Sequence, residues 1–279
     1  MPEPFDFGLT TERFRAFGDD PVNRWLDDGL HRVFDGREVR LEAGPGGARI
    51  EPGAPELAGP VRRFLGAGFD LAGFEELAAG DSVLRRLSAE LKGLRPALLP
   101  DAFEMLVTSI TAQQVSLRAA LAIRRRFVER LGLPVGRVWA FPSREVVARA
   151  EPEELAAVGF SGRKAEYTVG LARSPLDLEA LADLPDDEVI ARLTALSGIG
   201  VWTAEWFLAR HLGRPDVWPA GDLAVRKAVG AFYFGGSVLS IEETRAFGER
   251  FAPHRTLAAH HLLVGARGAE TVSAKIGGR

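Results

Sequence analysis

The stretch Leu-Ser-Gly-Ile-Gly-Val-Trp-Thr-Ala, residues 196–204, lies between two segments whose apolar residues repeat with helical spacing. Because so few residues separate the two predicted helices, the helices must form a tight hairpin. Gly198 and Gly200 let the backbone turn sharply and let another molecule approach it closely. Free amides at the start of the second helix favour an anion, such as a phosphate group. A plain glycine-capped turn is the alternative interpretation.

Other side chains of this hairpin have separate predicted roles. Ile199 can anchor the turn in the core, whereas the hydroxyl of Ser197 or Thr203 can add a hydrogen bond to the anion.

The loop Trp-Pro-Ala-Gly-Asp, residues 218–222, follows the hairpin and precedes another helical pattern that begins at Leu223. Asp222 therefore occupies the position of a helix N-cap. The spacing also lets the intervening helix return Asp222 toward the face that the hairpin presents. We expect its carboxylate to cap the helix, to face a ligand there, or to do both.

The rest of the chain divides into a part with strand patterns and a part with helical patterns. Short alternating or β-branched runs predict a small N-terminal sheet, at residues 5–7, 30–34, 38–42 and 48–51. From about Phe74 onward the apolar spacing is mostly helical, as at residues 103–110. The predicted fold class is α+β, with a mostly helical core preceded by a small antiparallel sheet.

Acidic pairs mark several predicted helix starts, at residues 153–154, 186–187 and 242–243. Carboxylates are favoured at helix N-termini by the helix dipole. We interpret these pairs as helix caps rather than catalytic groups.

The composition excludes several kinds of site. The chain of 279 residues has no cysteine, which excludes disulfides, thiolate zinc sites, iron–sulfur clusters and cysteine nucleophiles. Its net charge of −3 argues against a uniformly basic surface, although one basic face can still bind a polyanion. No stretch approaches the roughly 20 apolar residues of a membrane span, so we expect a cytoplasmic location.

The L-x-G-I-G-x-x-T-A hairpin, followed by a Gly/Pro-rich loop that ends in Asp222, resembles the helix-hairpin-helix (HhH-GPD) superfamily of DNA glycosylases. Within it, the chain is most similar to the bacterial 3-methyladenine DNA glycosylase II (AlkA) family. The resemblance runs from about Asp101 to Leu263 and includes further motifs in order, at residues 110–116, 141–143, 159–165 and 251–255.

The resemblance implies a division into three parts. These are an N-terminal sheet domain (1–78), a helical subdomain (79–101 plus 215–279) and a second helical subdomain that carries the hairpin (102–214). The implied partner is duplex DNA that contains a damaged base, bound near the nucleoid by a monomer that makes no membrane contact.

The resemblance also implies catalytic roles. Asp222 matches the family's catalytic aspartate, which stabilises the sugar as it becomes cationic. Trp202 stands where relatives similar to endonuclease III carry a nucleophilic lysine. We therefore expect a monofunctional glycosylase that excises alkylated bases, of the 3-methyladenine and 7-methylguanine type, without cleaving the strand. The alternatives are a glycosylase for deaminated or oxidised bases and a non-catalytic DNA-binding module.

The same comparison implies the substrate pocket and the wedge that replaces the flipped base. Trp202 maps onto a pocket tryptophan, and Trp206, one helical turn later, can share its face. Gln114, with Gln113 beside it, occupies the wedge position. Leu263 stands where some relatives have a further pocket tryptophan.

Charged residues outside the hairpin are candidate DNA contacts. Arg163 and Lys164 can bind phosphates, whereas Arg118 and residues 124–126 indicate either a solvated helix face or phosphate contacts. The family's hairpin can also hold a sodium or potassium ion, here through the carbonyls of Thr194, Leu196 and Ile199. No other cofactor is expected.

Overall fold

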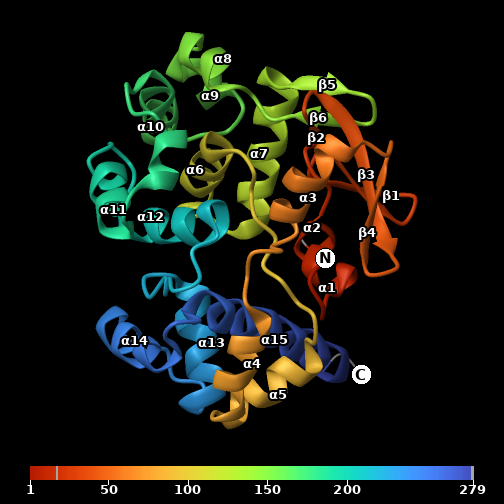
Figure 1. Cartoon of the computed structure of the whole chain (residues 1–279). Coiled ribbons are helices and arrows are strands. Elements are labelled where there is room, and N and C mark those ends of the chain that lie inside the picture. The colour runs from red at the N-terminus through yellow and green to blue at the C-terminus, as the bar shows by residue number, and fades with distance from the viewer. Residues whose placement is uncertain (17, 278–279) are drawn as a thin grey trace.

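The computed structural model describes residues 1–16 and 18–277, with side chains up to residue 268. Figure 1 shows a small sheet domain beside one group of helices, with a second group of helices below both. This arrangement confirms the predicted fold class. Within the described residues, no helix is both long and apolar enough to cross a membrane.

The N-terminal domain is an antiparallel sheet of order β1-β2-β3-β4, covered by short helices. In β2 and β3, Leu30 and Leu41 are paired and fully buried, and they face Phe64 of α3 in one apolar core. Its elements are α1 (Phe7–Thr11), α2 (Arg13–Ala16), β1 (Arg24–Leu26), β2 (Gly29–Phe34), β3 (Arg37–Gly44), β4 (Gly47–Glu51), η1 (Pro55–Leu57) and α3 (Ala58–Phe64).

One detail of this domain differs from the sequence prediction. Residues 5–7 do not form a strand, because the Asp6 carboxylate accepts the Leu9 amide at 2.7 Å and starts helix α1. The predicted range 1–78 also includes α4 (Leu71–Ala79), whose buried residues belong to the main core and which packs on α5 (Ser82–Glu90). The domain boundaries stay a prediction.

The helical subdomain that carries the hairpin is built around α6, which contacts α7, α10 and α12. Its last helix passes into a π-helical turn, η3, before the chain leaves the subdomain. The elements are α6 (Ala102–Ala112), α7 (Leu117–Leu131), β5 (Leu133–Val135), β6 (Val138–Ala140), α8 (Arg144–Arg149), α9 (Pro152–Ala157), α10 (Gly162–Arg173), η2 (Glu179–Asp183), α11 (Asp186–Thr194), α12 (Val201–Phe207) and η3 (Leu208–Leu212).

The second helical subdomain combines α4 and α5 with the C-terminal helices, as Figure 1 shows. Its long helix α15 packs on both α5 and α13. The C-terminal elements are α13 (Leu223–Tyr233), α14 (Ile241–Gly248), η4 (Glu249–Phe251) and α15 (Arg255–Gly277). The predicted range 215–279 ends with residues 278–279, which lie outside the described residues.

The acidic pairs lie at helix starts, as predicted. Residues 153–154, 186–187 and 242–243 all fall in the first turns of their helices. In α14, the Ser240 hydroxyl accepts the Glu243 amide at 3.1 Å, while the Glu243 carboxylate accepts the Ser240 amide at 2.8 Å. This reciprocal pair is a capping box.

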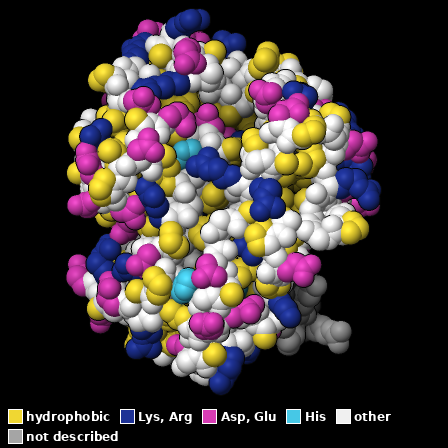
Figure 2. Space-filling view, viewed as in Figure 1, with side chains coloured by type: hydrophobic (Ala, Val, Ile, Leu, Met, Phe, Trp, Pro, Cys, Tyr) yellow, Lys and Arg dark blue, Asp and Glu magenta, His cyan; other side chains and the backbone are white. Residues whose placement is uncertain are grey.

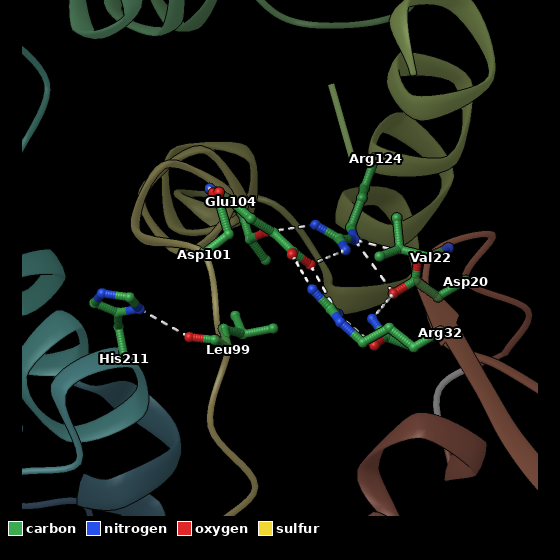
Figure 3. Close-up of polar contacts among 10 residues, drawn as sticks. Asp20, Val22, Arg32, Leu99, Asp101, Glu104, Arg124 and His211 are labelled. Carbon is green, nitrogen blue, oxygen red and sulfur yellow. Dashed lines mark hydrogen bonds and ion pairs between the residues drawn. The ribbon is translucent and has the colours of Figure 1, made fainter. Parts of the chain in front are cut away.

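A buried ion network fastens the sheet domain to the hairpin-carrying subdomain (Figure 3). The Glu104 carboxylate in α6 is fully buried and accepts hydrogen bonds from Arg32 of β2 and from Arg124 of α7, the latter at 2.7 Å. Arg124 also donates to Asp20 at 3.3 Å. Arg124 was a candidate phosphate contact, and this prediction is wrong because its guanidinium is 5% exposed and already paired.

We expect the substitution Glu104→Gln to lower the free energy of unfolding by about 3–5 kcal/mol, because it leaves two buried guanidinium groups without their shared anion. Urea unfolding at neutral pH measures this loss. Glu129→Gln is the matched control, since the pair of Glu129 with Arg125 is exposed and is worth roughly 0.5 kcal/mol or less.

The same effect should depend on pH. Burial opposes ionisation of Glu104, but Arg32 and Arg124 outweigh it and hold the pKa of the carboxyl below its ordinary value. A lowered pKa in the folded state adds stability that disappears as the pH falls through that pKa. The difference between wild type and Glu104→Gln should therefore shrink below pH 4.5, the ordinary glutamate pKa. A constant difference down to pH 3 would contradict this origin.

Candidate active site

The carboxylate of Asp222 is held at the start of α13, as the sequence indicates. One oxygen, Oδ1, accepts the backbone amides of Ala224 at 2.8 Å and Val225 at 3.1 Å. The other oxygen, Oδ2, accepts the indole N–H of Trp202 at 2.8 Å and that of Trp206 at 2.9 Å. A carboxylate offers about four lone-pair positions, and these four donors match them. The side chain is thus an oriented acceptor, fixed from both sides.

The two tryptophans differ in what else they contact. Trp206 is 2% exposed, and the Arg210 guanidinium lies over its ring at 3.5 Å from the centroid. His260 meets the same ring edge-on, with centroids 5.6 Å apart. Trp202 is less buried and packs at the margin of the core. Of the two indoles predicted to contact substrate, only Trp202 therefore has surface left for a base, and the substrate role of both stays a prediction.

The hairpin turn joins α11 to α12 with the geometry that its glycines suggest. Gly198 has a φ of 83°, and a Cβ there would collide with the ring of Tyr167. Gly200 is the N-cap of α12 and supplies no side-chain cap, so the first amides of this helix lack a side-chain acceptor. Ser197 is exposed beside them, and Ile199 anchors the turn in the core at 5% exposure.

Thr203 differs from its prediction. Its side chain is 1% exposed, because it lies on the inner face of α12. Its hydroxyl therefore cannot reach a phosphate at the surface in this structure, and Ser197 is the hydroxyl that the hairpin exposes.

The loop after α6 lies against the hairpin. The Gln113 amide donates to the Gly198 carbonyl at 2.8 Å, which ties the loop to the turn. Gln114 is exposed and has a φ of 52°, a conformation that is uncommon for a residue with a side chain. Strained backbone of this kind often occurs at ligand-contacting positions. The wedge role of Gln114 and the DNA contact of Gln113 remain predictions, and Gln113 has a structural role as well.

Arg163 and Lys164 are neighbours at the start of α10 with different environments. Arg163 is exposed and forms no ion pair or hydrogen bond through its side chain within the described residues. The Lys164 ammonium donates to the carbonyls of Thr111 at 2.9 Å and Gln113 at 2.5 Å, and partial burial lowers its pKa. Lys164 therefore fastens the end of α6, and Arg163 is the side chain available for a phosphate.

Comparison with known proteins places this geometry in a family. The family model described as "HhH-GPD superfamily base excision DNA repair protein" matches residues 107–253, which is more than half of the chain. The chain belongs to the HhH-GPD superfamily. This match runs from the second half of α6 to just beyond η4 and so includes the loop, the hairpin and Asp222.

Individual relatives agree with this assignment. The chain is 33% identical to a DNA-3-methyladenine glycosylase of Bacillus subtilis over 178 residues, which cover 61% of this chain and 59% of that protein. It is 30% identical to DNA-3-methyladenine glycosylase 2 of Escherichia coli over 229 residues, or 80% and 75% of the two chains. The matched part is thus less than two thirds of the Bacillus protein's length.

A solved structure extends the likeness to the whole fold. The 3-methyladenine DNA-glycosylase from Archaeoglobus fulgidus superimposes with a TM-score of 0.83 and 30% identity. The superposition covers 94% of this chain and 95% of that one, so the sheet domain is part of the shared architecture.

The carbonyls predicted to bind a monovalent cation lie at the end of α11 and in the hairpin turn. The Leu196 carbonyl already accepts the Ile199 amide at 3.2 Å, and a carbonyl oxygen has a second lone pair. A sodium or potassium ion held by Thr194, Leu196 and Ile199 stays a prediction. Leu263 is 8% exposed and belongs to the main core, so its effect on substrate choice also stays open to test.

The contact between Arg210 and the ring of Trp206 was not predicted from the sequence. The position of Arg210, four residues after Trp206, is the only signal in the sequence, because i,i+4 neighbours share a helix face. In a π-helical turn this spacing is altered, so the contact of Arg210 with Trp206 becomes visible only in the structure.

We expect Lys164→Met to release the end of α6, because two backbone carbonyls lose a charged donor. Hydrogen exchange of the amides of residues 110–114 should become about tenfold faster, corresponding to roughly 1.5 kcal/mol for a bond to a charged group. Arg163→Met is the matched control and should leave these amides unchanged. Equal exchange in the two variants would show that Lys164 does not hold the loop.

Proposed function

We propose that the protein is a DNA glycosylase that hydrolyses the N-glycosidic bond of alkylated bases in duplex DNA. The observation that carries the proposal is the Asp222 carboxylate, held by two indole and two backbone donors next to the hairpin turn. The protein's membership in a family of base excision DNA repair proteins and the names of its relatives support the same activity.

In this mechanism, Asp222 acts mainly through its charge. As the bond between sugar and base lengthens, the sugar acquires oxocarbenium character, which a nearby carboxylate stabilises. Two unit charges about 4 Å apart interact by roughly 4 kcal/mol at an effective dielectric constant near 20, which corresponds to about three powers of ten in rate. Because donors occupy both oxygens, the carboxylate is better prepared to stabilise a cation than to take a proton from water.

The hairpin and the loop after α6 would bind the DNA around this carboxylate. The amides at the start of α12 and the Ser197 hydroxyl would bind a phosphate, and Gln114, which is exposed, would fill the space that a flipped base leaves. Figure 2 shows Lys and Arg interspersed with Asp and Glu on the viewed face. DNA affinity would therefore come from local contacts rather than from a broad basic surface.

The proposed glycosylase has no strand-cleaving activity. Trp202 donates its indole N–H to Asp222 at the position where lyase-competent relatives carry an amine. We also propose that the protein acts as a monomer on DNA at the nucleoid, in the cytoplasm, because that DNA is its substrate.

We expect Asp222→Asn to reduce single-turnover release of methylated purines by about a thousandfold, because it removes the charge that stabilises the sugar cation. Asparagine is also a good N-cap, so the fold should persist. DNA affinity, measured by fluorescence anisotropy, should stay equal or rise, since a negative charge leaves the anionic interface. Undiminished base release by this variant would remove Asp222 from the mechanism.

Borohydride should trap no covalent adduct between the protein and DNA containing a damaged base, because position 202 carries an indole and not a nucleophilic amine. A lyase-competent glycosylase serves as the positive control in the same gel assay. A trapped adduct would show that another lysine supplies the nucleophile.

A further inference from the structure

Among the described residues, Arg210, which lies over Trp206, and Arg13 lack the hydrogen-bonding partners that buried guanidinium groups normally have. Arg210 lies in η3, and Arg13 lies in α2 of the sheet domain. Each covers an aromatic ring, at 3.5 Å from the centroid of Trp206 and 5.4 Å from that of Phe14. Within the described residues neither forms an ion pair or donates a hydrogen bond, and the Nε of Arg210 is buried without an acceptor.

These guanidiniums lie close enough to repel one another. Burial lowers the pKa of Arg210 to about 9, and repulsion from Arg13 and Arg267 adds to the effect. Burial lowers the pKa of Arg13 to about 10, and repulsion from Arg267 and Arg124 adds to it. Both groups remain protonated at neutral pH. Arg267 pairs with Glu12 at 2.9 Å, and Asp222 is the carboxylate that favours the charged form of Arg210. Within the described part of the chain, the Arg210 guanidinium is thus near Asp222 but is not bonded to a carboxylate.

Trp206 separates this charge from the catalytic carboxylate. Its indole N–H contacts Asp222 Oδ2, while its ring face is covered by Arg210. A nucleotide whose C1′ lies at Asp222 and whose base points toward Trp202 and Trp206 would have a negative charge near its sugar and the charge of Arg210 on the far side of the Trp206 ring. This polarity matches the direction in which charge separates when the glycosidic bond breaks.

The benefit of the positive charge depends on the charge of the base. When the C1′–N bond breaks, its electron pair goes to the base, and water then adds to C1′ and loses a proton. A cationic base, such as 7-methylguanine, leaves as a neutral molecule, and the proton goes to solvent. An uncharged base, such as hypoxanthine, leaves as an anion and takes up the proton afterwards. A guanidinium near the base stabilises the anion that an uncharged base becomes as it leaves. It disfavours binding of a cationic base.

We propose that Arg210, which lies over the Trp206 ring, determines specificity by allowing this site to release lesions that are uncharged in DNA. The inference rests on the proposed glycosylase function. It also explains why Trp206 cannot attract a cationic ring to its face, since a cation of the protein already occupies that position.

The test compares single-turnover release of hypoxanthine and 7-methylguanine from duplexes that are otherwise identical. Both are purines with a carbonyl at C6; 7-methylguanine also carries a 2-amino and a 7-methyl group, so the ratio of the two release rates is compared between variants rather than between the bases. We expect Arg210→Gln to slow hypoxanthine release at least about tenfold, while 7-methylguanine release stays equal or rises. Arg13→Gln, on a different domain, should shift the ratio in the same direction by a smaller factor.

Two further variants separate charge from structure. Arg210→Lys keeps the positive charge and should retain most of the hypoxanthine activity, whereas a purely structural role for the planar guanidinium predicts its loss. Arg86→Gln removes a positive charge from the exposed face of α5 and should leave the ratio unchanged. Thermal unfolding of each variant identifies any loss that comes from misfolding.

Failure of the inference and failure of the proposed function give different results. If wild type releases both bases and Arg210→Gln leaves their ratio unchanged, Arg210 does not determine specificity and the glycosylase proposal stands. If wild type releases neither base, nor methylated purines from alkylated DNA, the proposed function itself is wrong.

Discussion

The site depends on one carboxylate that accepts hydrogen bonds from two helices at once. Asp222 caps α13 through one oxygen and receives both indoles of α12 through the other. The same interaction that orients this carboxylate therefore also joins α12 to α13. Its position is therefore set by the assembled fold rather than by the loop that carries it.

The sheet domain supports this site indirectly. Glu104 binds the sheet to α6 by a buried ion network, and the other end of α6 carries the loop with Gln113 and Gln114. A helix transmits position along its length because its hydrogen bonds are internal. Both ends of α6 are thus fixed. The ion network holds its first turn, and the contacts of Lys164 and Gly198 hold the loop at its other end.

Local features were predictable from sequence, and contacts between distant elements were not. The hairpin glycines, the N-cap position of Asp222 and the acidic helix starts each follow from residue preferences within a few positions. The strand assigned to residues 5–7 failed because an aspartate cap outweighed an alternating pattern. Arg124, Thr203 and Lys164 illustrate the other limit: an arginine run, a threonine and a lysine do not reveal whether a partner lies across the fold, so their burial and pairing become visible only in three dimensions.

The π-helical turn after α12 has a consequence for how this pocket can vary. A π turn contains one more residue than the α-helical turn it replaces, and it often occurs at functional sites. Removing a single residue from η3 would restore regular α-helical winding. The side chains that follow the deletion in this helix would then rotate by about 100° around the helix axis. Arg210 would then leave the indole, while Asp222, on the next helix, would keep its own cap. The deletion of one residue would thus move the positive charge away from Trp206 and leave the Asp222 carboxylate in place.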